Sequence, residues 1–70
     1  MAVKAPPRVT SDPQIMGGWP CVEGTRIPAE TVLAYLKRGS TAYEIVSDYP
    51  YMPLGGVEAV EAWARENGRL

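Results

Sequence analysis

The chain has 70 residues, so it forms one domain at most, and such a domain buries only about 60% of the surface that its unfolded chain exposes. Seven Lys and Arg against eight Asp and Glu give a formal net charge of −1, which excludes a general attraction to phosphate backbones. One cysteine and no histidine exclude an internal disulfide and a zinc site with the usual ligand spacing, so we expect no metal and no cofactor.

The lone thiol, Cys21, is typical of a protein of the reducing cytosol. The N-terminus lacks the apolar run of a signal peptide, and no stretch approaches the ~20 apolar residues that span a bilayer. We therefore expect a soluble, cytoplasmic protein that does not contact a membrane.

The N-terminal part of the chain is expected to be extended. Residues 1–7 are small and include two prolines, which predicts a flexible arm, and residues 8–70 are expected to form the single domain. The extended part of that domain, residues 8–27, is predicted to contain a short β-prone Arg8-Val9-Thr10, a turn at Ser11-Asp12-Pro13, and one or two short strands around a turn at Glu23-Gly24.

After Pro28 the apolar spacing changes to that of helices, and residues 28–67 are predicted to form a three-helix bundle. The first helix covers residues 28–38 and ends at Gly39, which accepts the left-handed conformation just beyond a helix. Its apolar face consists of Ala29, Val32, Leu33 and Leu36.

A second helix is predicted from a capping box at Thr41 and Glu44, and it ends at Pro50. A third begins near Pro53 and ends at Asn67-Gly68. The expected buried faces are Ala42, Ile45, Val46 and Tyr49 in the second helix, and Val57, Val60, Trp63 and Ala64 in the third. Gly55-Gly56 weakens the start of the third helix, because each glycine costs about 1 kcal/mol against alanine. The predicted fold class is thus mainly α: a short extended segment followed by a helix-turn-helix bundle.

Catalytic chemistry has little support in these residues. The usual acid–base residue, histidine, is absent, and Cys21 has no histidine to activate it. Glu58 and Glu61 form the one acidic pair with suitable spacing, but a solvated helix face explains them. We expect no catalytic residue, no small-molecule substrate and no enzymatic activity.

The shape of the predicted bundle favours nucleic-acid binding, but its charge does not. In a helix-turn-helix the second helix of the pair enters the major groove, and here that helix would present Glu58 and Glu61, which repel phosphates. The cations available for DNA are Arg8, Arg26, Lys37 and Arg38, and two copies of the chain are needed to combine them into a sufficient patch. Arg26, just before the first helix, either binds a carboxylate of a partner or closes an internal ion pair.

Several short strings occur at fixed separations along the chain. They are Thr10-Ser11-Asp12-Pro13, Gly17-Gly18-Trp19-Pro20, Gly24-Thr25-Arg26-Ile27-Pro28, the helix end Leu36–Gly39 with Ser40, and Ile45 to Tyr49-Pro50. In this order and spacing the sequence resembles the family known as domain of unknown function 433. The residues that carry the motif, which we expect to be mainly structural, are Gly18, Pro20, Gly24, Thr25, Arg26, Ile27 and Pro28.

The resemblance implies a small strand region followed by a homeodomain-like three-helix core. It also implies an antitoxin of the VapB class, encoded beside a small PIN-like ribonuclease toxin, which occupies the toxin as a dimer and binds its own promoter DNA. Two alternatives stay open: a dimeric interaction module of helix-turn-helix shape, and a stand-alone transcriptional regulator without a toxin partner. The pair Gly55-Gly56 departs from relatives, which usually carry polar, helix-forming residues there.

The size of the core predicts self-association. A core of this size rarely supplies more than ~3–5 kcal/mol without a disulfide, a metal or a second subunit. The aromatic residues exceed what three short helices enclose, so we expect them in the core or at a dimer seam: Trp19, Tyr43, Tyr49, Tyr51 and Trp63. We predict a homodimer or a higher even oligomer in sedimentation at micromolar concentration. A folded, stable monomer would contradict this prediction.

Overall fold

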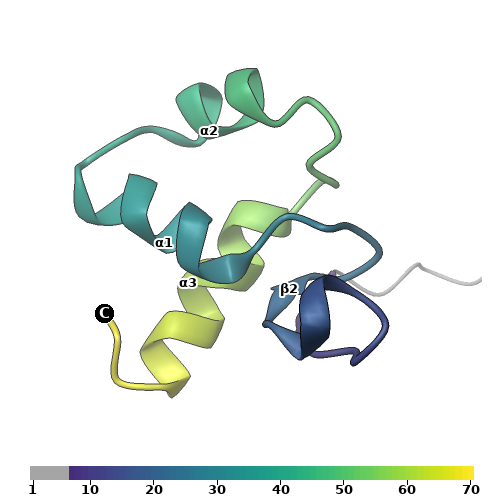
Figure 1. The fold of residues 1–70 in the computed structure, drawn as a ribbon. Helices are drawn as coiled ribbons and strands as arrows, with labels where there is room; N and C mark the ends of the chain where they lie inside the picture. The colour runs from purple at the N-terminus through teal and green to yellow at the C-terminus, as the bar shows by residue number, and fades with distance from the viewer. Residues whose placement is uncertain (1–6) are drawn as a thin grey trace, which may run out of the picture.

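The computed structural model describes residues 7–70, which form a mainly helical domain with a small sheet at its N-terminal end (Figure 1). The elements in order are β1 (Val9–Thr10), the 3-10 turn η1 (Met16–Gly18), β2 (Cys21–Val22), α1 (Ala29–Lys37), α2 (Ala42–Asp48) and α3 (Gly56–Glu66). The mainly α architecture with a short extended N-terminal segment is therefore as predicted. The flexible arm predicted for residues 1–7 lies outside the described residues, except for Pro7.

The sheet is a single antiparallel pair, in which Val9 lies opposite Val22 and Thr10 opposite Cys21. After β2 the chain turns back, and Pro28 forms a bridge to Cys21. The predicted turn at Glu23-Gly24 is therefore present, with one strand before it and an isolated bridge after it. Cys21 and Val22 are both buried, so this turn is anchored in the core.

The ends of the first two helices confirm the local signals in the sequence. The N–H of Ser40 donates to the carbonyl of Tyr35 and the N–H of Gly39 to that of Leu36, both at 3.0 Å. This is a Schellman motif, in which Gly39 takes a φ of 84°. Thr41 and Glu44 form the predicted capping box, with hydrogen bonds of 3.1 and 3.2 Å.

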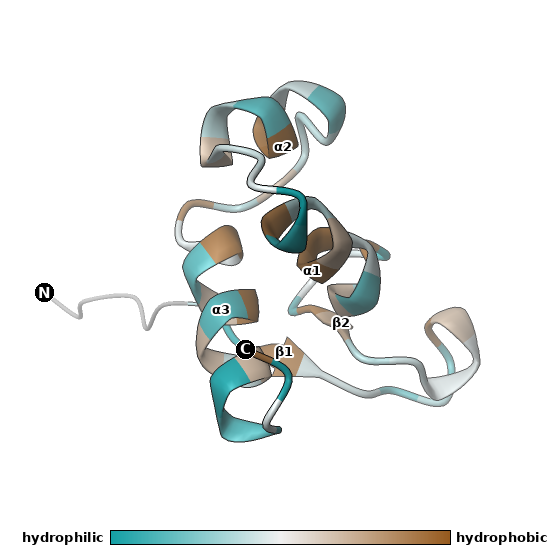
Figure 2. Ribbon diagram, turned by 90° about the vertical axis from the view of Figure 1, so that its left-hand side faces the viewer, coloured by the Kyte–Doolittle hydropathy of each residue, from teal (hydrophilic) through white to brown (hydrophobic). Residues whose placement is uncertain are grey.

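The core lies where α1 packs on α3 and where α3 packs on both strands. Figure 2 shows apolar stretches on these elements where they face one another. The buried residues of this core are Val22, Ile27, Ala29, Val32, Leu33, Ile45, Met52, Val57, Val60 and Ala64. The predicted buried faces of α1 and α3 are thus largely confirmed, with Leu36 and Trp63 half-buried.

The buried face predicted for α2 is confirmed only in part. Ile45 is buried and Tyr49 half-buried, but Ala42 and Val46 are exposed. In Figure 1 α2 lies at the top of the molecule, and the connection through residues 49–55 descends from it to α3. α1 and α3 pack on each other, and α2 contacts this core through Ile45. In addition, the Tyr35 hydroxyl of α1 donates a 2.6 Å hydrogen bond to Asp48 of α2. Periodicity identified a shared face, and no neighbouring element covers all of it.

The core position expected for several aromatic residues is wrong. Trp19, Tyr43 and Tyr51 are 63%, 82% and 88% exposed. The core between α1 and α3 is filled by aliphatic side chains, so these three aromatic side chains lie outside it. The alternative that they lie at a dimer seam stays a prediction.

Two glycines shape the start of α3, which begins at Gly56 rather than near Pro53. Gly55 takes a φ of 84°, a conformation that other residues adopt only with strain. A Cβ atom at Gly56 would lie 2.5 Å from the Met52 sulfur, so the absence of a side chain lets α3 pack closely on Met52. The glycine pair therefore weakens the helix locally but fits its first turn into the core.

Within residues 7–70, no helix is both long enough and apolar enough to cross a bilayer.

A salt bridge ties the chain after α3 to the first turn of α1. The Arg69 guanidinium donates to both carboxylate oxygens of Glu30 at 2.5 and 2.6 Å. This hydrogen bonding to Arg69 holds the pKa of Glu30 below its ordinary value, against the opposing effect of partial burial. The same hydrogen bonds raise the pKa of Arg69.

We predict that Arg69→Gln lowers the melting temperature by a few degrees at pH 7. A carboxylate whose pKa is lowered in the folded state stabilises the fold above its unfolded pKa, here 4.5, and the stabilisation is lost as the pH falls through the folded pKa. The difference between wild type and variant should therefore vanish on acidification below that range. Arg65→Gln is the matched control, because Arg65 and Glu61 lie 3.6 Å apart within α3 and connect it to no other element. An equal loss for both variants, or a loss that persists at acidic pH, would contradict the prediction.

Candidate functional site

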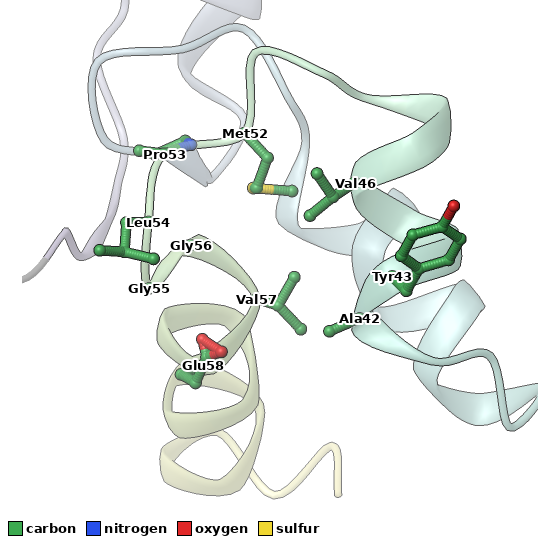
Figure 3. Close-up of a pocket in the computed structure, with 10 residues that line it drawn as sticks. All are labelled: Ala42, Tyr43, Val46, Met52, Pro53, Leu54, Gly55, Gly56, Val57 and Glu58. Atoms are coloured by element: carbon green, nitrogen blue, oxygen red, sulfur yellow. The ribbon is translucent and has the colours of Figure 1, made fainter.

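An open groove of about 430 Å³ lies between α2 and the start of α3 (Figure 3). Its volume falls within the ~300–1,000 Å³ typical of binding pockets. Three residues of α2, four of the connection and three of α3 line it: Ala42, Tyr43 and Val46; Met52, Pro53, Leu54 and Gly55; Gly56, Val57 and Glu58. We call this feature the α2–α3 groove.

The α2–α3 groove has an apolar floor and exposed apolar margins. Figure 3 shows Val46, Met52 and Val57 pointing into the space between the two helices. Met52 and Val57 are buried, whereas Leu54 is 98% exposed, Tyr43 82% and Val46 41%. Large apolar side chains gathered on one exposed side of a domain are typical of an interaction site. The groove is therefore suited to binding an apolar surface.

The electrostatics of this side are acidic. Glu58 is the one charged residue that lines the α2–α3 groove. Residues 41–67 carry five carboxylates and one cation, Arg65, but not all of them face the groove: Asp48 accepts from Tyr35 of α1, and Glu66 lies beside Pro7 and Arg8. Arg65 lies 3.6 Å from Glu61 and so is already paired. Phosphates are repelled here, which makes this side unsuited to nucleic acid.

The four predicted DNA contacts are exposed, but one copy of the chain does not bring them together. Arg8 lies 3.8 Å from Glu23, beside the sheet. Arg26 precedes α1, whereas Lys37 and Arg38 lie at its far end, about 14 Å along the helix axis. The Arg38 guanidinium lies 4.7 Å from the centre of the Tyr35 ring. Whether two copies combine these cations into one patch stays a prediction.

The motif string before α1 is largely structural. The Thr25 hydroxyl donates to the Val22 carbonyl at 2.8 Å and accepts from the N–H of Ile27 at 3.0 Å. Ile27 is buried and Pro28 is the N-cap of α1. The other motif positions serve the neighbouring turns: Gly18 has a φ of 91°, Gly24 a φ of 77°, and the Pro20 carbonyl accepts from the N–H of Ala29 at 2.9 Å.

Arg26 differs from the rest of this string. Its side chain is exposed and makes no hydrogen bond or ion pair with the residues that the structure describes. An internal ion pair, one of the two roles expected for Arg26, is therefore not found within residues 7–70. The other role, contact with a partner, stays a prediction.

The candidate reactive groups are not assembled into a site. Cys21 is buried in β2, and this burial raises the pKa of its thiol, which disfavours the reactive thiolate. In the part of the chain that the structure describes, no three acidic or cysteine side chains gather as a metal site. What the α2–α3 groove offers is surface for binding.

Sequence reasoning missed the groove itself. The apolar spacing predicts that Val46 is buried. Leu54 stands alone between Pro53 and Gly55 and so belongs to no apolar pattern. A large apolar residue inside a proline- and glycine-rich connection was the signal available. Such a residue belongs to no helix face, and Leu54 is 98% exposed.

The fold and the groove together define a class: a small three-helix domain with a two-stranded sheet, whose surface is suited to binding. The chain belongs to the family described as "Protein of unknown function (DUF433)", whose model matches residues 9–64, so the resemblance in the sequence is confirmed. It is similar to the uncharacterized protein y4eO of Sinorhizobium fredii (strain NBRC 101917 / NGR234), with 32% identity over 59 residues. That match covers 84% of this chain but only 27% of the relative. No solved structure matches the chain.

We predict that Thr25→Val lowers the free energy of unfolding by about 1–2 kcal/mol, because it leaves the N–H of Ile27 without an acceptor in a partly buried turn. Urea unfolding followed by tryptophan fluorescence measures this. The neighbouring substitution Arg26→Ala is the control and should change stability little. A larger loss for Arg26→Ala than for Thr25→Val would show that Arg26, and not the Thr25 hydroxyl, holds the string in place.

Proposed function

We propose that this domain is an antitoxin-like protein that binds a PIN-like ribonuclease toxin through the α2–α3 groove. The observation that carries the proposal is the exposure of Tyr43, Val46 and Leu54 around an open apolar groove. Contact with a protein partner would remove these side chains from water, and tyrosine is among the residues that dominate binding energy in interfaces. The choice of a toxin as the partner follows from the family resemblance.

Binding of the domain's own promoter DNA is a second candidate function, supported by Lys37 and Arg38. Both are exposed, and neither pairs with a carboxylate within residues 7–70. Two copies of the chain would bring the number of cations towards the ~6–10 phosphate contacts that make DNA affinity steeply salt-dependent. DNA would be held by these cations more than by base reading from α3, where Glu58 and Glu61 repel phosphates.

The turn lengths also bear on how a helix-turn-helix would be arranged. Residues 38–41 separate α1 from α2, which suits the turn of ~3–4 residues, often containing glycine, that this motif uses. Residues 49–55 separate α2 from α3, a longer connection. By turn length the pair α1–α2 fits the motif better, but α2 would then be the helix that enters the major groove, and its charged residues are the carboxylates Glu44 and Asp48.

The toxin proposal is tested by co-expressing the full chain with a PIN-like protein encoded beside its gene. We expect the two proteins to co-purify and the ribonuclease activity to be suppressed in proportion to the amount of the chain added. Absence of such a neighbour, or full ribonuclease activity in the presence of excess chain, would contradict the toxin function.

The DNA candidate needs a separate measurement, which is binding to the upstream DNA at several salt concentrations. The double variant Lys37→Ala with Arg38→Ala should bind all sequences more weakly and with a shallower salt dependence. Glu61→Ala is the control for α3. If the double variant leaves the salt slope unchanged, or if changing Glu58 or Ala59 alters sequence preference, the cations are not the contacts.

A further inference from the structure

We propose that the α2–α3 groove receives an amphipathic helix of the protein partner, with apolar anchors flanked by Lys and Arg. This inference rests on the proposed function in so far as the partner is a protein, and it adds the chemistry that the partner must present. It follows from three properties of the groove: its apolar lining, its small number of free backbone donors and its charge.

The apolar lining matches the face of a helix. Val46 projects from α2 and Val57 from α3 towards the same space, and Met52 points into it from the connection (Figure 3). Leu54 extends the apolar surface outward from the connection and is almost fully exposed. A helix presents apolar side chains at i, i+3, i+4 and i+7, and it can lay such a face into a groove of this kind.

The backbone around the groove disfavours an extended partner strand. Two residues of the connection, Pro50 and Pro53, have no N–H to offer. The N–H groups of Met52 and Gly56 already donate to the carbonyls of Tyr49 and Pro53, both at 2.9 Å. A partner strand would find few free donors here, so its own polar backbone would be left unpaired. A helix satisfies its backbone internally and needs only apolar contact.

The charge selects a cationic partner over a second copy of the chain or DNA. Glu58 lines the groove, and its lining contains no Lys or Arg. Arg65, the one cation of residues 41–67, is already paired with Glu61. A second copy docked by this same face would bring its own Glu58 against this one, and DNA would bring phosphates. Lys or Arg beside the apolar anchors would instead gain from Glu58.

Two synthetic helical peptides of equal length test the proposal. Both carry Leu at i, i+3, i+4 and i+7; one has Lys at the flanking positions and the other has Glu. Fluorescence anisotropy with the full 70-residue chain measures their binding. We expect the Lys peptide to bind about tenfold more tightly at low salt, with the advantage shrinking as salt is added. Equal affinities that do not respond to salt would overturn the charge selection.

Substitutions locate the peptide. Leu54→Ser should weaken the Lys peptide about tenfold, because it removes a large apolar side chain from the contact. Tyr51→Ser is the matched control: Tyr51 is 88% exposed but does not line the groove, and its removal should leave binding unchanged. Glu58→Lys should reverse the preference in favour of the Glu peptide. Because these three side chains are exposed, the variants should fold like the wild type by circular dichroism, with Glu58→Lys melting slightly lower because it replaces the acidic residue in the first turn of α3.

Two further results would overturn the proposal. If Leu54→Ser leaves Lys-peptide binding unchanged, the groove is not the binding site. If Leu54→Ser instead dissociates an oligomer of the chain in sedimentation, the occupant is a second copy. A failure of this inference can be distinguished from a failure of the proposed function. Toxin binding that is lost with Leu54→Ser, together with equal affinities for the two peptides, removes this inference alone, whereas groove binding of the Lys peptide without any toxin binding removes the toxin function alone.

Discussion

The contact between α1 and α3 is the constraint on which the rest of the structure depends. Ala29 in α1 and Ala64 in α3 are both fully buried, and such small residues allow two helices to approach closely. Val32 and Val60 fill the same interface without any exposure. The salt bridge between Glu30 and Arg69 then ties the start of α1 to the chain that follows α3. A domain of this length has room for one such contact, and it uses its aliphatic residues there.

This use of the aliphatic residues determines what is left at the surface. With α1 and α3 packed on each other, α2 is held to the core mainly by Ile45 and to α1 by the hydrogen bond from Tyr35 to Asp48. The other side of α2 remains open, and Leu54 in the connection has no core to join. The α2–α3 groove therefore results from the packing of α1 on α3, which leaves Val46 and Leu54 exposed.

Local signals predicted the elements well because their causes are local. The glycine after α1 and the capping box at Thr41 act through hydrogen bonds within a few residues, so the sequence contains all that is needed. The burial of α2 was only partly predicted, because periodicity shows which side chains share a face but not whether another element covers it. The start of α3 was mispredicted for a similar reason. The need for glycine at position 56 comes from the nearby Met52 side chain, and helix propensities do not include such a tertiary contact. The four predicted cations lie at the surface, but the length of α1 separates Arg26 from Lys37 and Arg38.

The net charge of −1 conceals a division that bears on function. Residues 41–67 carry five carboxylates and one cation, whereas residues 7–40 carry four cations and three carboxylates. Because charges act over only about 8–10 Å at physiological salt, a partner responds to the part it touches and not to the total. A protein that acts on RNA must attract phosphates and so needs cations on its substrate-binding surface. On the proposed function, an apolar groove with an acidic margin would be complementary to such a surface, and its binding would compete directly with RNA.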